Sequence, residues 1–198
     1  PLKTFWKPLK AHCDKLGIIF FSTPMSREAA KMLHEELDVK LWKIGSGDIL
    51  DFVMLDYIRQ TKKPVILSSG MSTLAEVKKS VKFLQEKNPA VTLLHCVSKY
   101  PCPPEQLNLN TINFYKKTFK IPIGFSDHSL DNRSALVAAA LGITILEKHF
   151  SLSRNLWGAD HKVSLTPQEL KSLIKEIRKI EKDGQYKKQI LKTDFAKK

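Results

Sequence analysis

The sequence predicts an α/β protein of the (β/α)8 TIM-barrel class, incomplete here, with about six of the eight β/α units. Apolar runs without polar alternation are typical of parallel strands buried on both faces. Helical patterns separate these runs, so a strand–helix unit recurs about every 20 to 30 residues. Polar, Gly- or Ser-rich segments follow every run, which favours a barrel over a doubly wound sheet with one switch point.

The elements follow one another in a regular order. A first helix ends at Lys15 and is closed by Gly17. The six predicted strands cover residues 18–22, 41–44, 64–67, 91–96, 121–125 and 143–147. The predicted helices cover residues 27–37, 53–61, 74–87, 111–119, 133–141 and 167–182. Thr73 with Glu76 and Thr166 with Glu169 have the spacing of capping boxes, which strengthens two of these helices.

The number of strands falls short of a closed barrel. Such a barrel needs eight strands and usually about 250 residues, whereas this chain has 198. The simplest expectation is that the first two β/α units are missing, so that the chain is a fragment, a truncated product or half of an assembly. We expect a partial barrel domain at 1–182 and a linker at 183–198.

Composition limits the class of protein further. With 42% hydrophobic residues the chain can form one sizeable core, and it has no apolar run of the roughly 20 residues that a membrane span requires. It also lacks a signal peptide, and its three cysteines show no C-x-x-C spacing, so we expect a cytoplasmic protein with reduced thiols. No G-x-S-x-G elbow or P-loop is present, which argues against a serine hydrolase or an NTPase.

The net charge of +13 is compatible with solvated helix faces, anionic metabolites or a polyanion. The lysines are spread over predicted helix faces and the C-terminal tail, without interleaved aromatic residues. We therefore expect neither a nucleic-acid nor a membrane partner.

Two histidines follow apolar runs near the end of the pattern. His128 stands in GFSDHS at 124–129, and His149 stands in LEKHF at 146–150. If consecutive parallel strands carry both to one sheet edge, the imidazoles can converge on a divalent ion or a substrate oxygen. Asp127 and Glu147 are close enough in sequence to support such a site. For either histidine alone, a hydrogen-bonded structural role is the alternative.

Two lysines fall at predicted strand ends among apolar neighbours. A buried ammonium group is costly unless it meets an anion or a carboxylate, so phosphate or carboxylate binding is the functional interpretation. The alternative is that the side chain extends to solvent at the rim. Ser46 and the adjacent glycines favour anion binding at Lys43, because backbone N–H groups can approach closely there. Both interpretations stay open for Lys148.

Small hydroxyl residues also follow several predicted strands, at 22–23, 68–69 and 126. Singly they are typical of caps and turns, and together they can form a phosphate cradle. His95 and Cys96 lie inside a predicted strand and are expected in the core. Asp160 and His161 follow Gly158 in a long loop, where they can contact a substrate or form a turn.

Taken together, these motifs resemble the N-acetylneuraminate (sialic acid) synthase family. The resemblance runs in order from about residue 9 to residue 181, and it rests on FSTP at 21–24, KIGSGD at 43–48, ILSSGM at 66–71, LHC at 94–96 with Ser98 and Tyr100, GFSDH at 124–128, EKH at 147–149 and GADH at 158–161.

The resemblance implies condensation of phosphoenolpyruvate with an N-acyl hexosamine, typically N-acetylmannosamine, to a nine-carbon 2-keto sugar acid and phosphate. It implies that Mn2+ or Mg2+, held by His128 and His149, polarises the sugar aldehyde. The enol carbon then attacks the aldehyde, water adds to the resulting oxocarbenium centre, and phosphate leaves with C–O cleavage.

The resemblance also assigns roles to individual residues. The positions that match phosphoenolpyruvate contacts in the family are Thr23, Lys43, Ser46, Ser68, Ser98 and Ser126, and those that face the sugar, assigned here as catalytic, are Asp48, Tyr100 and Asp160. Ser98 stands where some members have asparagine, and Asp48 is shorter than the glutamate that many members carry.

Two parts of the family pattern have no counterpart in the sequence. These are the first barrel strands, which carry a glutamate near the metal and a further lysine, and the C-terminal antifreeze-like domain, which supplies an arginine to a partner subunit. We therefore expect a homodimer for the full-length parent and little turnover by the isolated chain. The alternatives are a synthase for legionaminic or pseudaminic acid and a non-catalytic basic barrel remnant.

Overall fold

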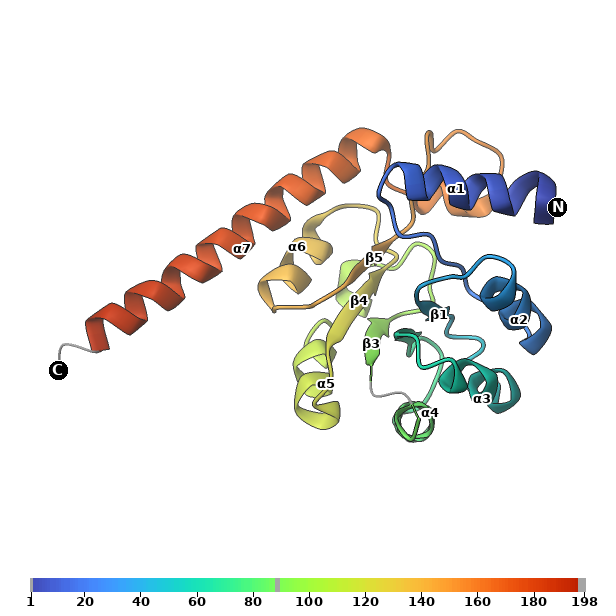
Figure 1. Ribbon diagram of the computed structural model, residues 1–198. Helices are drawn as coiled ribbons and strands as arrows, with labels where there is room; N and C mark the ends of the chain where they lie inside the picture. The colour runs from blue at the N-terminus through green and yellow to red at the C-terminus, as the bar shows by residue number, and fades with distance from the viewer. Residues whose placement is uncertain (1, 88–89, 196–198) are drawn as a thin grey trace. The chain divides into compact units, whose positions relative to one another are not determined.

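The computed structural model describes residues 2–87 and 90–195 of the chain (Figure 1). The chain divides into two compact units, Pro1–Leu94 and His95–Lys198, here called unit 1 and unit 2. The strand order is β1-β2-β3-β4-β5, and the division falls within β3. Each unit is a run of alternating strands and helices.

Unit 1 begins with a helical turn at Leu2–Trp6 and with α1 (Lys7–Lys15). It continues through α2 (Arg27–Glu35), β1 (Trp42–Ile44), α3 (Phe52–Gln60), β2 (Val65–Ser68), α4 (Leu74–Gln85) and the start of β3 (Val91–Cys96). The strands are parallel: Trp42 of β1 aligns with Val65 of β2, which aligns with Val91 of β3. Parallel pairing buries both strand faces, which explains why these segments lack polar alternation.

The starts of α2, α3 and α4 in unit 1 carry side-chain caps. The Ser26 hydroxyl accepts a hydrogen bond from Ala29 N at the start of α2, and Asp51 Oδ1 accepts one from Met54 N at the start of α3. Thr73 and Glu76 form the predicted capping box of α4. Each cap satisfies an N–H group that the first helical turn leaves without a partner, so these residues fix where the chain turns from strand to helix.

Unit 2 contains the end of β3, a 3-10 turn at Pro104–Gln106, α5 (Thr111–Phe119), β4 (Ile123–Asp127), α6 (Arg133–Ala140), β5 (Leu146–Lys148), a 3-10 turn at Ala159–Val163 and α7 (Pro167–Phe195). β4 and β5 pair in parallel, with Ser126 beside Glu147. α6 packs against α7 around a buried cluster of Ala135, Leu165 and Leu173. Because β4 and β5 are parallel neighbours, their carboxyl ends lie at the same edge of the sheet (Figure 1).

One predicted strand is wrong. Residues 18–22 have no strand structure within the described part of unit 1, and Ile18 and Ile19 are 57% and 61% exposed. The N–H group of Ile18 instead bonds to Cys13 O at 2.9 Å, which closes the end of α1. A strand requires a neighbouring backbone for its hydrogen bonds, and an apolar run alone does not supply one. The described chain therefore has five strands rather than six.

The predicted α/β class with parallel strands is otherwise confirmed. β3 and α5 have the predicted bounds, and the other elements differ from prediction by a few residues, apart from α7. α7 continues through most of the predicted linker to Phe195, and residues 196–198 lie outside the described residues. None of the helices in the described part of the chain has both the length and the apolar character needed to cross a bilayer.

Candidate functional site

In unit 1, the predicted anion-binding residues gather at the ends of β1 and β2. Lys43 lies in β1 with its side chain buried, and its Nζ donates to Ser68 Oγ at 2.9 Å and to Ile44 O at 3.3 Å. Ser68, the last residue of β2, is also buried. The strand register therefore places an ammonium group and a hydroxyl group in contact, as a phosphate or carboxylate site requires.

The loop after β1 brings two further predicted residues close together. A Cβ atom built on Gly45 would lie 3.3 Å from Asp48 Oδ2 and 3.7 Å from Thr23 Cγ2, so both side chains approach the backbone at Gly45. Ser46 lies half-buried in the same loop. Burial raises the pKa of Asp48, and the negative charge of Asp51 adds to this effect while Lys43 opposes it.

In unit 2, the two predicted histidines face one another. Asp127 of β4 aligns with Lys148 of β5, so His128 and His149 occupy the next matched positions beyond the strand ends. Their ring centroids lie 5.4 Å apart with the planes at 68°. Residues far apart in sequence thus present two imidazoles to one small region.

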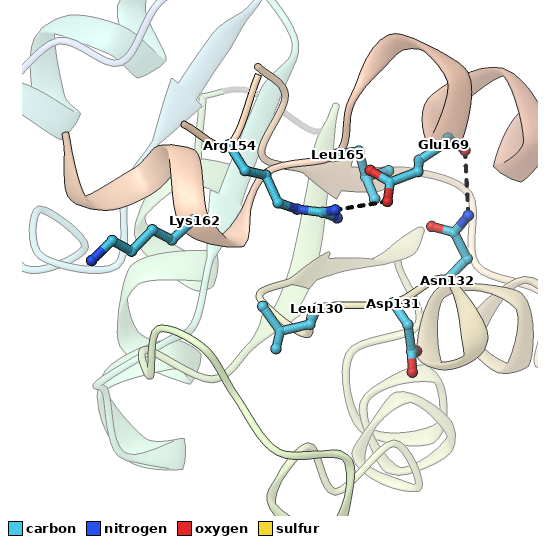
Figure 2. Close-up of a pocket in the computed structure, with 7 residues that line it drawn as sticks. All are labelled: Leu130, Asp131, Asn132, Arg154, Lys162, Leu165 and Glu169. Atoms are coloured by element: carbon cyan, nitrogen blue, oxygen red, sulfur yellow. Dashed lines mark hydrogen bonds and ion pairs between the residues drawn. The ribbon is translucent and has the colours of Figure 1, made fainter. Parts of the chain in front are cut away.

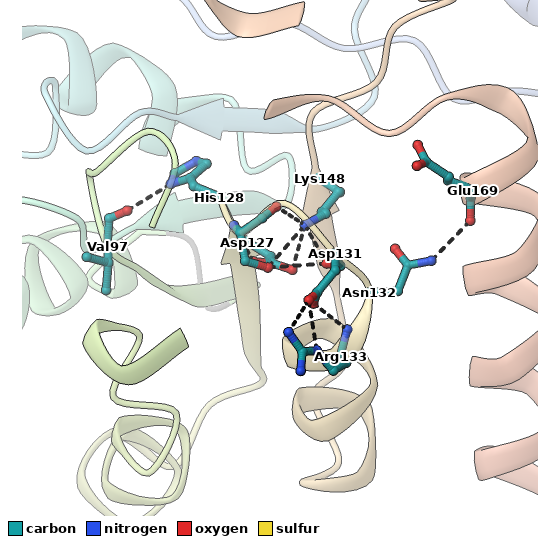
Figure 3. Close-up of polar contacts among 9 residues, drawn as sticks. Val97, Asp127, His128, Asp131, Asn132, Arg133, Lys148 and Glu169 are labelled. Carbon is teal, nitrogen blue, oxygen red and sulfur yellow. Dashed lines mark hydrogen bonds and ion pairs between the residues drawn. The ribbon is translucent and has the colours of Figure 1, made fainter. Parts of the chain in front are cut away.

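A backbone hydrogen bond fixes the tautomer of His128. Its Nδ1 lies 2.8 Å from Val97 O, which can only accept, so Nδ1 carries the proton and Nε2 keeps a lone pair (Figure 3). Burial lowers the pKa of His128, while the bond to Val97 opposes that effect. A neutral imidazole with an oriented lone pair is the form in which histidine binds metals.

Tyr100 and Asp160 complete this group. The Tyr100 ring centroid lies 4.0 Å from that of His128 and 5.6 Å from that of His149. Asp160 Oδ2 is 3.9 Å from His149 Nδ1, too far for a hydrogen bond but close enough for electrostatic interaction. Burial raises the pKa of Tyr100, and the charges of Cys96, Asp160 and Glu147 add to it. We call Tyr100, His128, His149 and Asp160 the histidine cluster.

The donor set of the histidine cluster fits part of a divalent metal site. Among residues 2–87 and 90–195, no group of three or more His, Cys, Asp or Glu side chains is arranged to hold a metal ion. The two imidazoles would be two ligands, which leaves the other positions to oxygens from water or substrate. The chemistry of the donors is thus suitable, whereas a complete protein-built cage is not present among those residues.

The structure corrects both interpretations of Lys148. Its side chain is 4% exposed, so it does not extend to solvent, and its Nζ forms an ion pair with Asp127 Oδ2 at 2.8 Å. Nζ also donates to the carbonyl oxygens of Ser129 at 2.6 Å and Asp131 at 3.2 Å (Figure 3). These acceptors occupy the ammonium protons, so Lys148 stabilises the segment that carries His128 and is not a phosphate ligand.

Three other residues considered in the sequence analysis lie outside the histidine cluster. Ser126 is buried and donates to Glu147 Oε1 at 2.7 Å, while Ser98 lies half-buried in the segment before Tyr100. His95 is a core residue as expected, with its Nε2 2.6 Å from Leu107 O.

Sequence reasoning missed the contribution of Val97, because its carbonyl group carries no side-chain signal. It also treated Asp127 as support for the histidines, although that carboxylate pairs with Lys148. The assignment of the individual site residues to substrates stays a prediction.

Parallel strands, crossover helices and polar residues at the carboxyl ends of the strands define an α/β-barrel type of enzyme domain. The chain belongs to the NeuB family, whose model matches residues 3–189.

Known proteins similar to this chain include proteins named as sugar-acid synthases. It is 42% identical over 179 residues to the N,N'-diacetyllegionaminic acid synthase of Campylobacter jejuni, covering 89% of this chain and 53% of that protein. It is 36% identical over 193 residues to the mouse N-acetylneuraminate-9-phosphate synthase, covering 96% of this chain and 54% of the relative. The chain thus spans about half the length of these relatives.

A solved structure supports the same fold. The crystal structure of N-acetylneuraminic acid (sialic acid) synthetase from Leptospira borgpetersenii, in complex with citrate, matches with a TM-score of 0.85 and 37% identity. The match covers 89% of this chain and 62% of that structure. This likeness confirms the predicted fold class.

Proposed function

We propose that this chain forms part of a synthase that condenses phosphoenolpyruvate with an N-acyl hexosamine to a 2-keto sugar acid and phosphate. The observation that carries the proposal is the histidine cluster, in which two imidazoles face one another beside Tyr100 and Asp160 in a NeuB-family chain. Two imidazoles and a nearby phenol suit the carbonyl and hydroxyl groups of a sugar better than they suit a phosphate.

The anion is assigned to unit 1. The Lys43 ammonium group and the Ser68 hydroxyl group, 2.9 Å apart, are a donor pair for the phosphate or carboxylate of phosphoenolpyruvate. Thr23 and Ser46 belong to the same proposed set. Ser98 and Ser126, which lie in unit 2, keep the assignment to phosphoenolpyruvate that the family resemblance implies. Holding the anion in a fixed orientation directs the enol carbon of phosphoenolpyruvate.

The sugar is assigned to Tyr100 and Asp160 of unit 2, and the family resemblance also implies a sugar contact for Asp48. Tyr100 keeps its phenolic proton because its pKa is raised, so it can donate to a sugar oxygen. The enol carbon forms a bond to the aldehyde carbon, and the aldehyde oxygen takes a proton. Water then adds to the former enol C2, and the C–O bond to phosphate breaks, so that the products are the keto acid and inorganic phosphate.

His128 and His149 are the residues that would hold Mn2+ or Mg2+ in this proposal. Such an ion, when bound, would act as a Lewis acid on the aldehyde oxygen. The protein contributes the fixed tautomer of His128 through Val97 O.

The sugar itself is proposed as N-acetylmannosamine, with the diacetamido sugar that leads to legionaminic acid as the second candidate. The second candidate rests on the 42% identity to the Campylobacter jejuni legionaminic acid synthase. Asp48 is one methylene shorter than the glutamate that many family members carry, which changes the reach of the sugar contact and leaves both sugars as candidates. We further propose that the full-length protein is a homodimer and that it is located in the cytoplasm.

The test measures phosphate release from phosphoenolpyruvate in the longest polypeptide that contains this sequence, with Mn2+ and each sugar in turn. We expect release that requires a sugar, with one sugar giving the higher kcat/KM. In the 198-residue chain alone we expect little turnover, so protection against unfolding by phosphoenolpyruvate is the readout there. Sugar-independent phosphate release, or none with any amino sugar, would overturn the proposal.

A further inference from the structure

In unit 2, the loop between β5 and α7 carries Asp160, and backbone hydrogen bonds tie its two ends together. Ser151 N donates to Leu165 O at 2.9 Å, and Leu165 N donates to His149 O at 2.8 Å. The end of the loop therefore lies beside the segment that carries His149. These bonds fix where the loop leaves and rejoins the unit, whereas the course of residues 152–164 depends on other contacts.

Arg154 fixes the part of the loop that returns to α7. Its Nη1 donates to Glu169 Oε1 at 2.8 Å in the first turn of α7 (Figure 2), and its Nε donates to Ser164 O at 3.0 Å. Ser164 is buried, and its Oγ donates to Asp160 O at 2.7 Å. The backbone of Asp160 is therefore held from the side of α7.

A second contact holds the same turn from the side of β5. Ser151 is buried, and its Oγ donates to Ser153 O at 2.8 Å. The same Oγ lies 2.7 Å from His161 Nδ1. Because a hydroxyl group has one proton and Ser153 O receives it, His161 Nδ1 is the donor in this contact. His161 thus bonds the 3-10 turn at Ala159–Val163 to the segment that directly follows His149.

Gly158, just before the turn, leaves room for the ring of His161. Its φ of +132° lies in the region that side chains rarely adopt. A Cβ atom at this position would lie 3.1 Å from His161 Cδ2 and 3.5 Å from His161 Nε2. A side chain at residue 158 would therefore strain the backbone and press on the imidazole that reaches Ser151.

We propose that His161 is a positioning residue, which holds the Asp160 carboxylate beside His149 through its hydrogen bond to Ser151. Asp160 directly precedes His161, and its Oδ2 lies 3.9 Å from His149 Nδ1 although its side chain is 73% exposed. A carboxylate on a loose turn would sample many positions, so the fixed backbone keeps Asp160 at the histidine cluster. Because Asp160 is assigned to the sugar under the proposed function, the effect of His161 on the substrate rests on that function.

The first test needs no activity and uses 15N NMR of the 198-residue chain. In the parent, the ring 15N shifts of His161 should show a proton on Nδ1, and the backbone order parameters at 159–163 should be near about 0.85. Ser151→Ala and His161→Phe each remove the bond and should lower these order parameters towards about 0.6. His161→Asn keeps an N–H donor near the place of Nδ1 and should restore most of the order.

The second test measures kinetics in the longest polypeptide that contains this sequence. His161→Phe and Ser151→Ala should each lower kcat/KM for the amino sugar at least about tenfold, and the double variant should lose no more than either single variant. The KM for phosphoenolpyruvate should stay within about twofold, and His161→Asn should recover most of the loss. Ser80→Ala is the matched control, because it removes a buried hydroxyl group that donates to Ile49 O in unit 1 and should leave kcat/KM for the sugar unchanged. If Ser151→Ala lowers the thermal midpoint, His161→Phe carries the test, since it leaves the bond from Ser151 to Ser153 in place.

The two measurements separate this inference from the proposed function. Order parameters that do not respond to His161→Phe or Ser151→Ala would overturn the positioning role, whether or not the protein is a synthase. A loosened turn that leaves kcat/KM for the sugar unchanged in an active protein would also overturn it, as would an equal loss in His161→Asn. A turn that loosens as expected in a protein without sugar-dependent turnover would support the role of His161 in holding Asp160 and would overturn the proposed function alone.

Discussion

Lys43 and Lys148 occupy the same kind of place in the fold, each in a β-strand among buried neighbours, and their surroundings differ. Lys148 forms an ion pair with the buried carboxylate of Asp127, and backbone carbonyl groups accept its remaining protons. Lys43 donates to the neutral Ser68 hydroxyl group and to Ile44 O, and it interacts electrostatically with the half-buried Asp48. Burial of a lysine therefore does not by itself identify a ligand site, and at Lys148 the carboxylate and carbonyl partners mark a structural residue.

The largest expected effect is on stability at Lys148. Lys148→Met leaves Asp127 as a buried charge without its cation, so we expect the free energy of unfolding to fall by about 3 to 5 kcal/mol. Urea denaturation measures this loss. Lys171→Met, at an exposed position on α7, should stay within about 0.5 kcal/mol of the parent. A loss below about 1 kcal/mol at Lys148 would remove the distinction between the two lysines.

At Lys43 we expect ligand binding to be lost. Lys43→Met removes the ammonium group that donates to Ser68 Oγ and Ile44 O, which is the group proposed to hold the anion of phosphoenolpyruvate. Protection by phosphoenolpyruvate against thermal unfolding should fall at least about tenfold in apparent affinity. Lys31→Met on the exposed face of α2 is the matched control. Full protection in Lys43→Met would place the anion elsewhere.

Metal binding should depend on a histidine of the cluster and should not depend on an exposed histidine elsewhere. His128→Ala removes one of two proposed metal ligands, so we expect Mn2+ affinity to fall by at least about tenfold, measured by paramagnetic broadening of His149 and Tyr100 resonances. The exposed His12→Ala on α1 should behave like the parent. Equal broadening in His128→Ala would show that the ion does not bind at the histidine cluster.

A smaller effect is expected from pH at the core histidine. Burial lowers the pKa of His95 below 6.5, so the unfolded chain binds a proton at higher pH than the folded chain does. The contribution of His95 is therefore fully present above pH 6.5 and is lost as pH falls from 6.5 through the folded pKa, with a slope of up to about 1.4 kcal/mol per pH unit. Denaturation at several pH values checks this. His95→Gln should reduce the slope, and an unchanged slope would contradict the assignment.

The sequence predicted the parts of the fold that depend on local pattern. β3 and α5 have the expected bounds because an uninterrupted apolar run and a clear helical period specify them. Residues 18–22 have an equally apolar run, yet a strand also needs a neighbouring backbone, which no local pattern encodes.

The candidate site was predictable where side-chain type alone points to chemistry. The facing of His128 and His149 follows from the register of two adjacent strands, which the spacing of the motifs anticipated. The partner of Lys148 and the acceptor for His128 Nδ1 did not follow from sequence, because one is a carboxylate 21 residues away and the other is a backbone carbonyl group.

The proposed condensation can be tested most directly with phosphoenolpyruvate that carries 18O in the oxygen between carbon and phosphorus. The longest polypeptide that contains this sequence is incubated with this substrate, an amino sugar and Mn2+, and mass spectrometry locates the label. Attack by the enol carbon followed by C–O cleavage predicts that all of the label leaves in inorganic phosphate. Label retained in the keto acid, which would indicate P–O cleavage, or phosphate released without a sugar would contradict the proposed reaction.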